Sequence, residues 1–137
     1  FLNEALRCLR SGGSMVMIEP WVSTWSRFIY SHLHHEPFEP EAREWTFPET
    51  GVLSGANGAL PWIIFQRDRQ RFEAEFSDLE IQEVRPFMPL RYLVSGGVSM
   101  RPLMPKGAFR FWQKLESGLC IWPDRWAMFA QIRLMRR

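Results

Sequence analysis

EALRCLRSGGSMVMIEP, residues 4–20, is the segment from which the fold can be predicted most directly. At its start, apolar residues recur at helical spacing and form one stripe. The members of this stripe are Phe1, Leu2, Ala5, Leu6 and Leu9. Arg7 and Arg10 complement the negative end of such a helix, and Gly12 or Gly13 can take the left-handed conformation that closes it. Residues 1–10 are therefore predicted to form a helix.

A buried strand is predicted directly after the two glycines, over residues 14–19. Met15 to Ile18 are apolar without alternation, which is typical of a strand covered on both faces. Pro20 cannot donate to a ladder and ends the strand. The succession of helix, turn and strand favours an α/β fold over a plain helical hairpin.

The remaining patterns predict helices over about 24–32, 67–76 and 106–120, a helical turn at 90–94, and strands over 79–85 and 126–135. In the last strand both alternating sets of residues are mostly apolar, which favours a central place in the sheet. Residues 34–56 hold several prolines and glycines and lack periodicity. We expect them to be a mobile, lid-like loop.

Composition limits the class of protein. The 137 residues are 46% hydrophobic, which suits a single domain over 1–137. A net charge of +2 without a basic stripe does not indicate nucleic acid as a partner. No apolar run in the sequence is long enough for a membrane span. We expect no signal peptide. Cys8 and Cys120 are isolated thiols, so a reduced, cytoplasmic protein is expected. Because a helix is already under way at Phe1 without an initiator Met, we expect a piece of a longer chain.

Residues 4–20 resemble one segment of the class I S-adenosylmethionine-dependent methyltransferases, of the methyltransferase type 11-like kind. In that family a helix ending in Leu-Arg-Pro-Gly-Gly feeds the fifth strand of the sheet. The resemblance implies that this chain is the C-terminal half of such a domain. It would have a partial Rossmann-like fold with a mixed sheet of about three strands and helices. The strand at 126–135 would insert antiparallel between those at 14–19 and 79–85.

The resemblance also implies which half of the site is present. Family members hold the cofactor on a Gly-rich loop after the first strand and its ribose on an acid after the second. This chain has no such loop, because its Gly12-Gly13 pair precedes a strand and its Gly96-Gly97 pair follows no buried one. S-adenosylmethionine is thus expected to bind the parent protein through residues outside this chain. We expect the isolated chain to have no cofactor-binding residues and to be inactive.

Candidate substrate residues lie after the first strand. Glu19 ends that strand, where ligands bind in open α/β sheets, although a solvated strand end is the alternative. Trp21 and Trp25 either line a pocket or pack the following helix. His32, His34 and His35 are candidates for acid–base or substrate contacts, or form an ordinary helix end. They have no distant partner pair for a metal, so no metal ligand is assigned. No catalytic residue is assigned either.

Two functions from different classes fit these sequence features. The first is the substrate-side part of a methyltransferase that acts on a small molecule. The alternative is a non-enzymatic α/β binding or self-assembly module, because seven Trp, eleven Phe and two Tyr can line an apolar pocket. In either case the strand at 14–19 is expected to present an unpaired edge. A homodimer through that edge is predicted.

Overall fold

The computed structural model describes residues 1–33, 37–46, 55–97, 104–105 and 107–137. Its centre is one three-stranded sheet of β1 (Ser14–Pro20), β2 (Leu79–Phe87) and β3 (Phe129–Arg136). The order is β1-β3-β2, and β3 runs antiparallel to both neighbours. The predicted central place of the C-terminal strand is confirmed. The expectation of a mixed sheet was wrong: β1 and β2 run in the same direction but do not pair, so each pair in the sheet is antiparallel.

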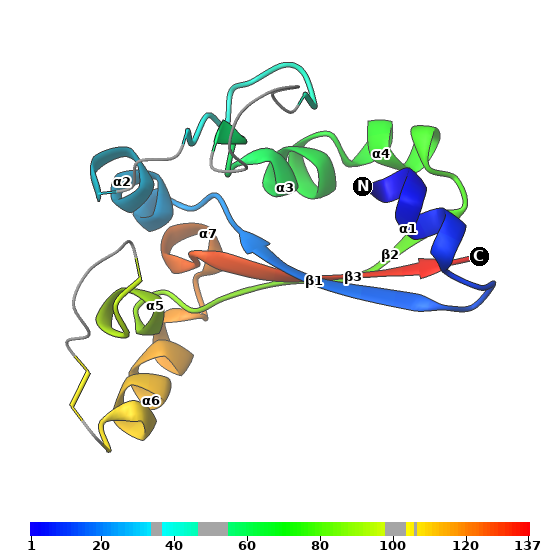
Figure 1. Ribbon diagram of the computed structural model, residues 1–137. Coiled ribbons are helices and arrows are strands. Elements are labelled where there is room, and N and C mark those ends of the chain that lie inside the picture. The colour runs from blue at the N-terminus through cyan, green and yellow to red at the C-terminus, as the bar shows by residue number, and fades with distance from the viewer. Residues whose placement is uncertain (34–36, 47–54, 98–103, 106) are drawn as a thin grey trace.

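One face of the sheet carries the core. Ile132 of β3 lies between Met17 of β1 and Val84 of β2, and it is fully buried. This face is covered by α1 (Leu2–Cys8), α3 (Leu60–Trp62), the π-helical turn η2 (Ile63–Arg67) and α4 (Arg69–Glu75). Figure 1 shows α1, α3 and α4 together on that side. The side chains from these helices that pack on the strands include Leu2, Leu6, Phe65 and Phe72.

The other face of β1 is open. Val16 and Ile18 are 57% and 59% exposed, whereas Met15 and Met17 pack against the core. The prediction that residues 15–18 are covered on both faces was therefore wrong. Strand residues alternate between faces even in an unbroken apolar run, and within the part of the chain that the structure describes, helices cover one face of β1 only.

The connection from α1 to β1 is closed by a side chain from the far end of the chain. Arg136 of β3 donates from Nη1 to the carbonyl oxygens of Leu6 and Leu9, at 2.8 and 2.5 Å. A guanidinium at the C-terminal end of a helix satisfies free carbonyls and complements the helix dipole. Gly12 then takes a φ of 73°, as expected for one of the two glycines. Gly13 is required for space, because a Cβ there would lie 2.7 Å from the Arg10 carbonyl oxygen.

The next helix, α2 (Thr24–Leu33), begins with a reciprocal pair of hydrogen bonds. The Ser26 N–H donates to Oγ of Ser23 at 3.0 Å, and the Ser23 N–H donates to Oγ of Ser26 at 2.7 Å. Both serines are buried. This exchange satisfies two backbone donors at the helix start, as a capping box does, and it confirms the predicted start of the helix near Ser23.

Between β2 and β3 the described residues form three helices, α5 (Arg91–Val94), α6 (Phe109–Leu119) and α7 (Pro123–Trp126). In Figure 1, α5 and α6 lie away from the helices that cover the core. The predicted strand at 126–135 began too early, because Trp126 ends α7 and β3 starts at Phe129. Pro123 at the first turn initiates this short helix, since its missing N–H costs nothing there.

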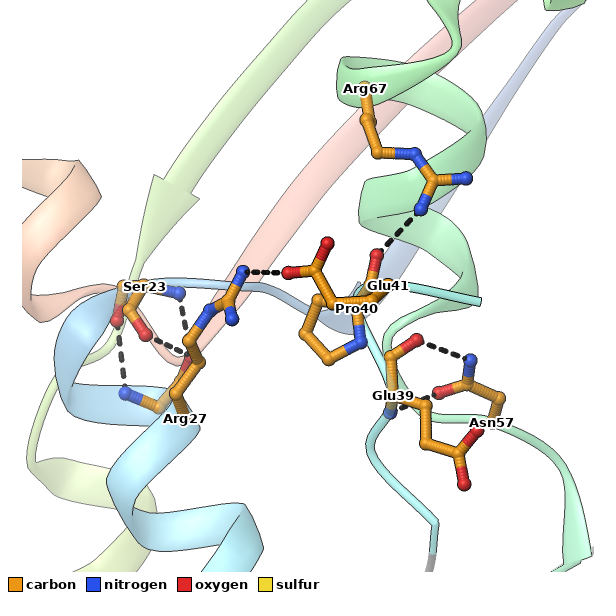
Figure 2. A network of polar contacts seen from close by, with 8 residues as sticks. Ser23, Arg27, Glu39, Pro40, Glu41, Asn57 and Arg67 are labelled. Carbon is orange, nitrogen blue, oxygen red and sulfur yellow. Dashed lines mark hydrogen bonds and ion pairs between the residues drawn. The ribbon is translucent and has the colours of Figure 1, made fainter. Parts of the chain in front are cut away.

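Part of the expected lid, residues 34–36 and 47–54, lies outside the described residues. Residues 37–46 form neither helix nor strand and are held by polar contacts to three other segments (Figure 2). Asn57 exchanges two hydrogen bonds with the backbone of Glu39, at 2.8 and 2.9 Å. Arg67 donates to the Pro40 carbonyl at 2.6 Å, and Arg27 pairs with Glu41 at 3.2 Å. These contacts place residues 37–46 beside α2 and η2.

Candidate functional site

A cleft of about 740 Å³ opens where β1 ends. Its walls come from the start of α1, the end of β1, residues 44–46 and 56–58, and the segment from α3 to the end of α4. A volume of this size suits a small organic ligand, since ligand sites commonly measure about 300–1000 Å³.

The inner wall of the cleft is apolar. Met17 contributes from β1, Ile64 and Phe65 from η2, and Phe76 from the end of α4. The turn η2 is wider than an α-helix, and the Asp68 N–H donates to the Ile63 carbonyl five residues before it, at 2.8 Å. Such π-helical turns recur at functional sites. Here the turn supplies two adjacent apolar side chains to the cleft.

Glu19 is the polar group at the β1 side of the cleft. It pairs in register with Ala130 and lies on the same face of the sheet as Met17, which faces the helices. It is half-buried, and its side chain makes no hydrogen bond or ion pair with another described residue. Burial raises the pKa of the Glu19 carboxyl above its ordinary value. The carboxylate is thus partly desolvated and free to receive a hydrogen-bond donor.

Trp45 also lines the cleft, and its orientation is fixed. Its indole N–H donates to Oδ2 of Asp68 at 3.0 Å. The guanidinium carbon of Arg71 lies 4.3 Å from the centroid of the Trp45 ring, a cation–π contact. Arg71 also pairs with Glu75 at 2.7 Å, and both residues line the cleft.

Trp21 and Trp25, for which the sequence left pocket lining and helix packing open, do not line this cleft. Trp21 is 2% exposed and belongs to the core beneath the helices. Trp25 donates its indole N–H to the Pro89 carbonyl at 2.9 Å and contacts the rings of Phe28 and Trp126. Of the candidate substrate residues, Glu19 alone among the described ones reaches the cleft.

His32, the candidate histidine within the described residues, does not reach the cleft either. His32 is exposed at the end of α2, where its Nδ1 lies 2.8 Å from the Phe28 carbonyl oxygen and its ring stacks on Phe28. His34 and His35 lie outside the described residues. Across the described ranges, no group of three or more His, Cys, Asp and Glu side chains is arranged to hold a metal ion.

Trp45, Arg71 and Phe76 are among the cleft residues that were not predicted from the sequence. Arg71 lies in the helix predicted over 67–76, and its pair with Glu75 four residues later is typical of an exposed helix face. Its stacking on Trp45 depends on a loop 26 residues earlier in the chain, which helical periodicity does not detect. Phe76 directly follows α4, and the sequence does not distinguish an apolar side chain in the core from one that lines a cleft.

None of the described helices is long and apolar enough to cross a membrane. No protein-family model, curated protein or solved structure matches this chain.

Proposed function

We propose that this chain is the C-terminal, substrate-side part of an S-adenosylmethionine-dependent methyltransferase-like protein that acts on a small molecule. The observation that supports this most is the strand order β1-β3-β2, with β3 antiparallel in the centre. In the class I family the last strand has the same place between the fifth and sixth strands. An inserted antiparallel strand at one end of the sheet is the unusual feature of that topology.

The connection before β1 also supports the proposal. The helix α1, the glycine turn and β1 succeed each other as in the family segment that residues 4–20 resemble. The helix packs back onto the sheet through Leu6 and Leu9, as an α/β unit requires. Its C-terminal end is held by Arg136 beside the start of β1.

The described residues do not fit S-adenosylmethionine itself. Gly12 lies between a helix and a strand, and Gly96 follows the short helix α5, so neither opens a helix after a buried strand. Gly58 packs against the ring of Phe38. We therefore assign the cofactor to residues of the parent protein outside this chain and derive no step through it. The cleft is the proposed site for the methyl acceptor, since Glu19 lies at the C-terminal end of β1, where ligands bind in open α/β sheets.

The alternative, a non-enzymatic module that binds an apolar ligand, is supported by the same cleft. Its aromatic wall residues Trp45, Phe65 and Phe76 suit an apolar molecule whether or not chemistry follows.

The coding sequence upstream of Phe1 separates the two proposals. The methyltransferase proposal predicts four strands alternating with helices, with a Gly-rich loop after the first strand. The extended protein should then transfer a tritiated methyl group from S-adenosylmethionine to a small molecule, and a substitution in the Gly-rich loop should abolish the transfer. An upstream sequence without this pattern, or an extended protein with an intact loop and no methyl transfer to a broad set of small molecules, would favour the binding module.

A further inference from the structure

We propose that the cleft binds a small molecule with an apolar body and a protonated amine, and that the Glu19 carboxylate receives the amine. The proposal rests on three properties of the cleft: its apolar walls, the free carboxylate at its β1 side, and the balance of charge around it.

The apolar walls of the cleft favour a ligand with an apolar body. Met17, Ile64, Phe65 and Phe76 present apolar atoms from three separate elements, and Trp45 adds a flat ring. An aryl or alkyl group removed from water against such walls gains roughly 25 cal/mol per Å² of apolar surface buried. A wholly polar ligand would leave this surface uncovered.

The Glu19 carboxylate favours a ligand with a cationic head group. A carboxylate that loses water without gaining a partner is destabilised, and Glu19 has no partner among the described residues. An ammonium group can donate hydrogen bonds to it and compensate its charge. The raised pKa of Glu19, caused by burial, agrees with a carboxylate that still lacks such a partner.

The other charges of the cleft exclude an anionic head group. Glu44 and Glu75 also line the cleft, and Arg71 is its only guanidinium among the described residues. Arg71 is already paired with Glu75 and stacked on Trp45. Among the described cleft side chains, three carboxylates therefore stand against one cationic group, and that group is already paired. A carboxylate or phosphate ligand would meet repulsion near Glu19.

The identification of this amine as the methyl acceptor rests on the proposed function, whereas its binding can be measured on residues 1–137 alone. Failure of methyl transfer in the extended protein would thus leave amine binding intact. Failure of amine binding would remove this inference without bearing on the strand order that supports the methyltransferase proposal.

The test titrates the chain with three matched probes, 4-phenylbutylamine, 4-phenylbutanol and 4-phenylbutanoate, at pH 7 and low ionic strength, by isothermal calorimetry or ligand-observed NMR. We expect the amine to bind at least fivefold more tightly than the alcohol, and the carboxylate to bind most weakly. Equal affinities, tighter binding of the carboxylate, or no binding of any probe would overturn the proposal.

Two variants locate the effect. Glu19→Gln keeps the size of the side chain and removes its charge, so it should reduce amine affinity at least fivefold and leave alcohol affinity unchanged. Glu83→Gln changes the net charge by the same amount on an exposed β2 residue outside the cleft and should leave both unchanged. Amine affinity that survives Glu19→Gln, or that falls equally in both variants, would contradict the role of Glu19. If Glu19→Gln fails to fold, the order of the three probes on the unmodified chain decides the question.

Discussion

Trp45 is fixed to Asp68 by a hydrogen bond of 3.0 Å from its indole N–H to Oδ2. Asp68 follows η2 and precedes α4, so this bond joins a loop residue to the helical segment that forms the inner wall of the cleft. Arg67 holds the same carboxylate from Nε at 2.8 Å. The position of the Trp45 wall therefore depends on Asp68, a residue that does not itself line the cleft.

Removal of this carboxylate should loosen the cleft. We expect Asp68→Ala to lower the free energy of unfolding by about 1 kcal/mol and to weaken binding of 4-phenylbutylamine, because the indole N–H loses its acceptor. Asp68→Asn keeps a carbonyl oxygen for Trp45 and should preserve most of the binding. Calorimetric titration of both variants checks this, and unchanged binding by Asp68→Ala would contradict it.

The same carboxylate predicts a dependence of stability on pH. The hydrogen bond from Arg67 lowers the pKa of Asp68; burial opposes this shift, and the hydrogen bond from Trp45 adds to it. A lowered folded-state pKa contributes stability that is present above the unfolded value of about 4 and is lost as the pH falls through the folded value. Wild type should therefore exceed Asp68→Asn in stability at pH 7, and the difference should vanish in strong acid. Urea unfolding at both pH values measures it; a constant difference would oppose the assignment.

The two faces of the sheet should differ in their tolerance of truncation. Ile132→Ala removes a fully buried side chain from the central strand and should cost about 2–5 kcal/mol. Ile18→Ala is the matched control, since Ile18 is 59% exposed on the open face of β1, and it should cost less than about 1 kcal/mol. Urea unfolding of the two variants compares them. Equal costs would show that the open face is covered in solution.

The ion pair between Arg91 and Glu116 should hold α5 against α6. Glu116 is 2% exposed and also accepts the Leu90 and Arg91 backbone N–H groups, at 2.9 and 2.5 Å. Glu116→Ala leaves these donors without a partner and should cost about 3 kcal/mol. Glu75→Ala breaks the half-exposed pair with Arg71 and should cost under about 1 kcal/mol. Hydrogen exchange of the Leu90 and Arg91 amides should accelerate in Glu116→Ala and stay unchanged in Glu75→Ala; no change in either would refute the assignment.

Self-association through β1 remains a prediction. The Trp21 N–H donates to Met128 and the Arg136 N–H to Gly13, each at 2.8 Å, so by alternation Val16 and Ile18 direct their N–H groups away from β3. No strand among the described residues pairs with that edge. We expect a homodimer in sedimentation equilibrium at tens of micromolar. Ile18→Pro should give a monomer, because it removes an outward N–H and leaves the β3 ladder intact. A wild-type monomer would exclude this contact.

The fold could be predicted from sequence where the pattern was local. Gly12-Gly13 marks the turn into β1, and the apolar run at the C-terminus identifies the central strand. The boundary at Trp126 was wrong, since the alternation of Trp126 and Met128 continues that of β3 although Pro123 starts a helix. The coverage of β1 also could not be predicted, because an apolar run does not reveal that helices pack on one face alone.

One residue of the candidate site, Glu19, was predicted from the sequence. Glu19 could be predicted because it ends a strand, and ligands bind at the carboxyl ends of strands in open α/β sheets. Trp45 and Arg71 meet through tertiary contacts across 26 residues, and Glu116 resembles any solvated helix residue until its partner 25 residues earlier is placed. Such contacts leave no periodic signal in a single sequence.

Calorimetric titration with S-adenosylmethionine is the most direct test of the methyltransferase proposal. The titration is carried out on residues 1–137 and, in parallel, on the chain extended by the residues encoded upstream. We expect no low-micromolar binding by residues 1–137, because they have no Gly-rich loop after a buried strand, and a one-to-one complex in the micromolar range for the extended chain. Tight binding by residues 1–137 alone, or none by the extended chain, would contradict the proposal.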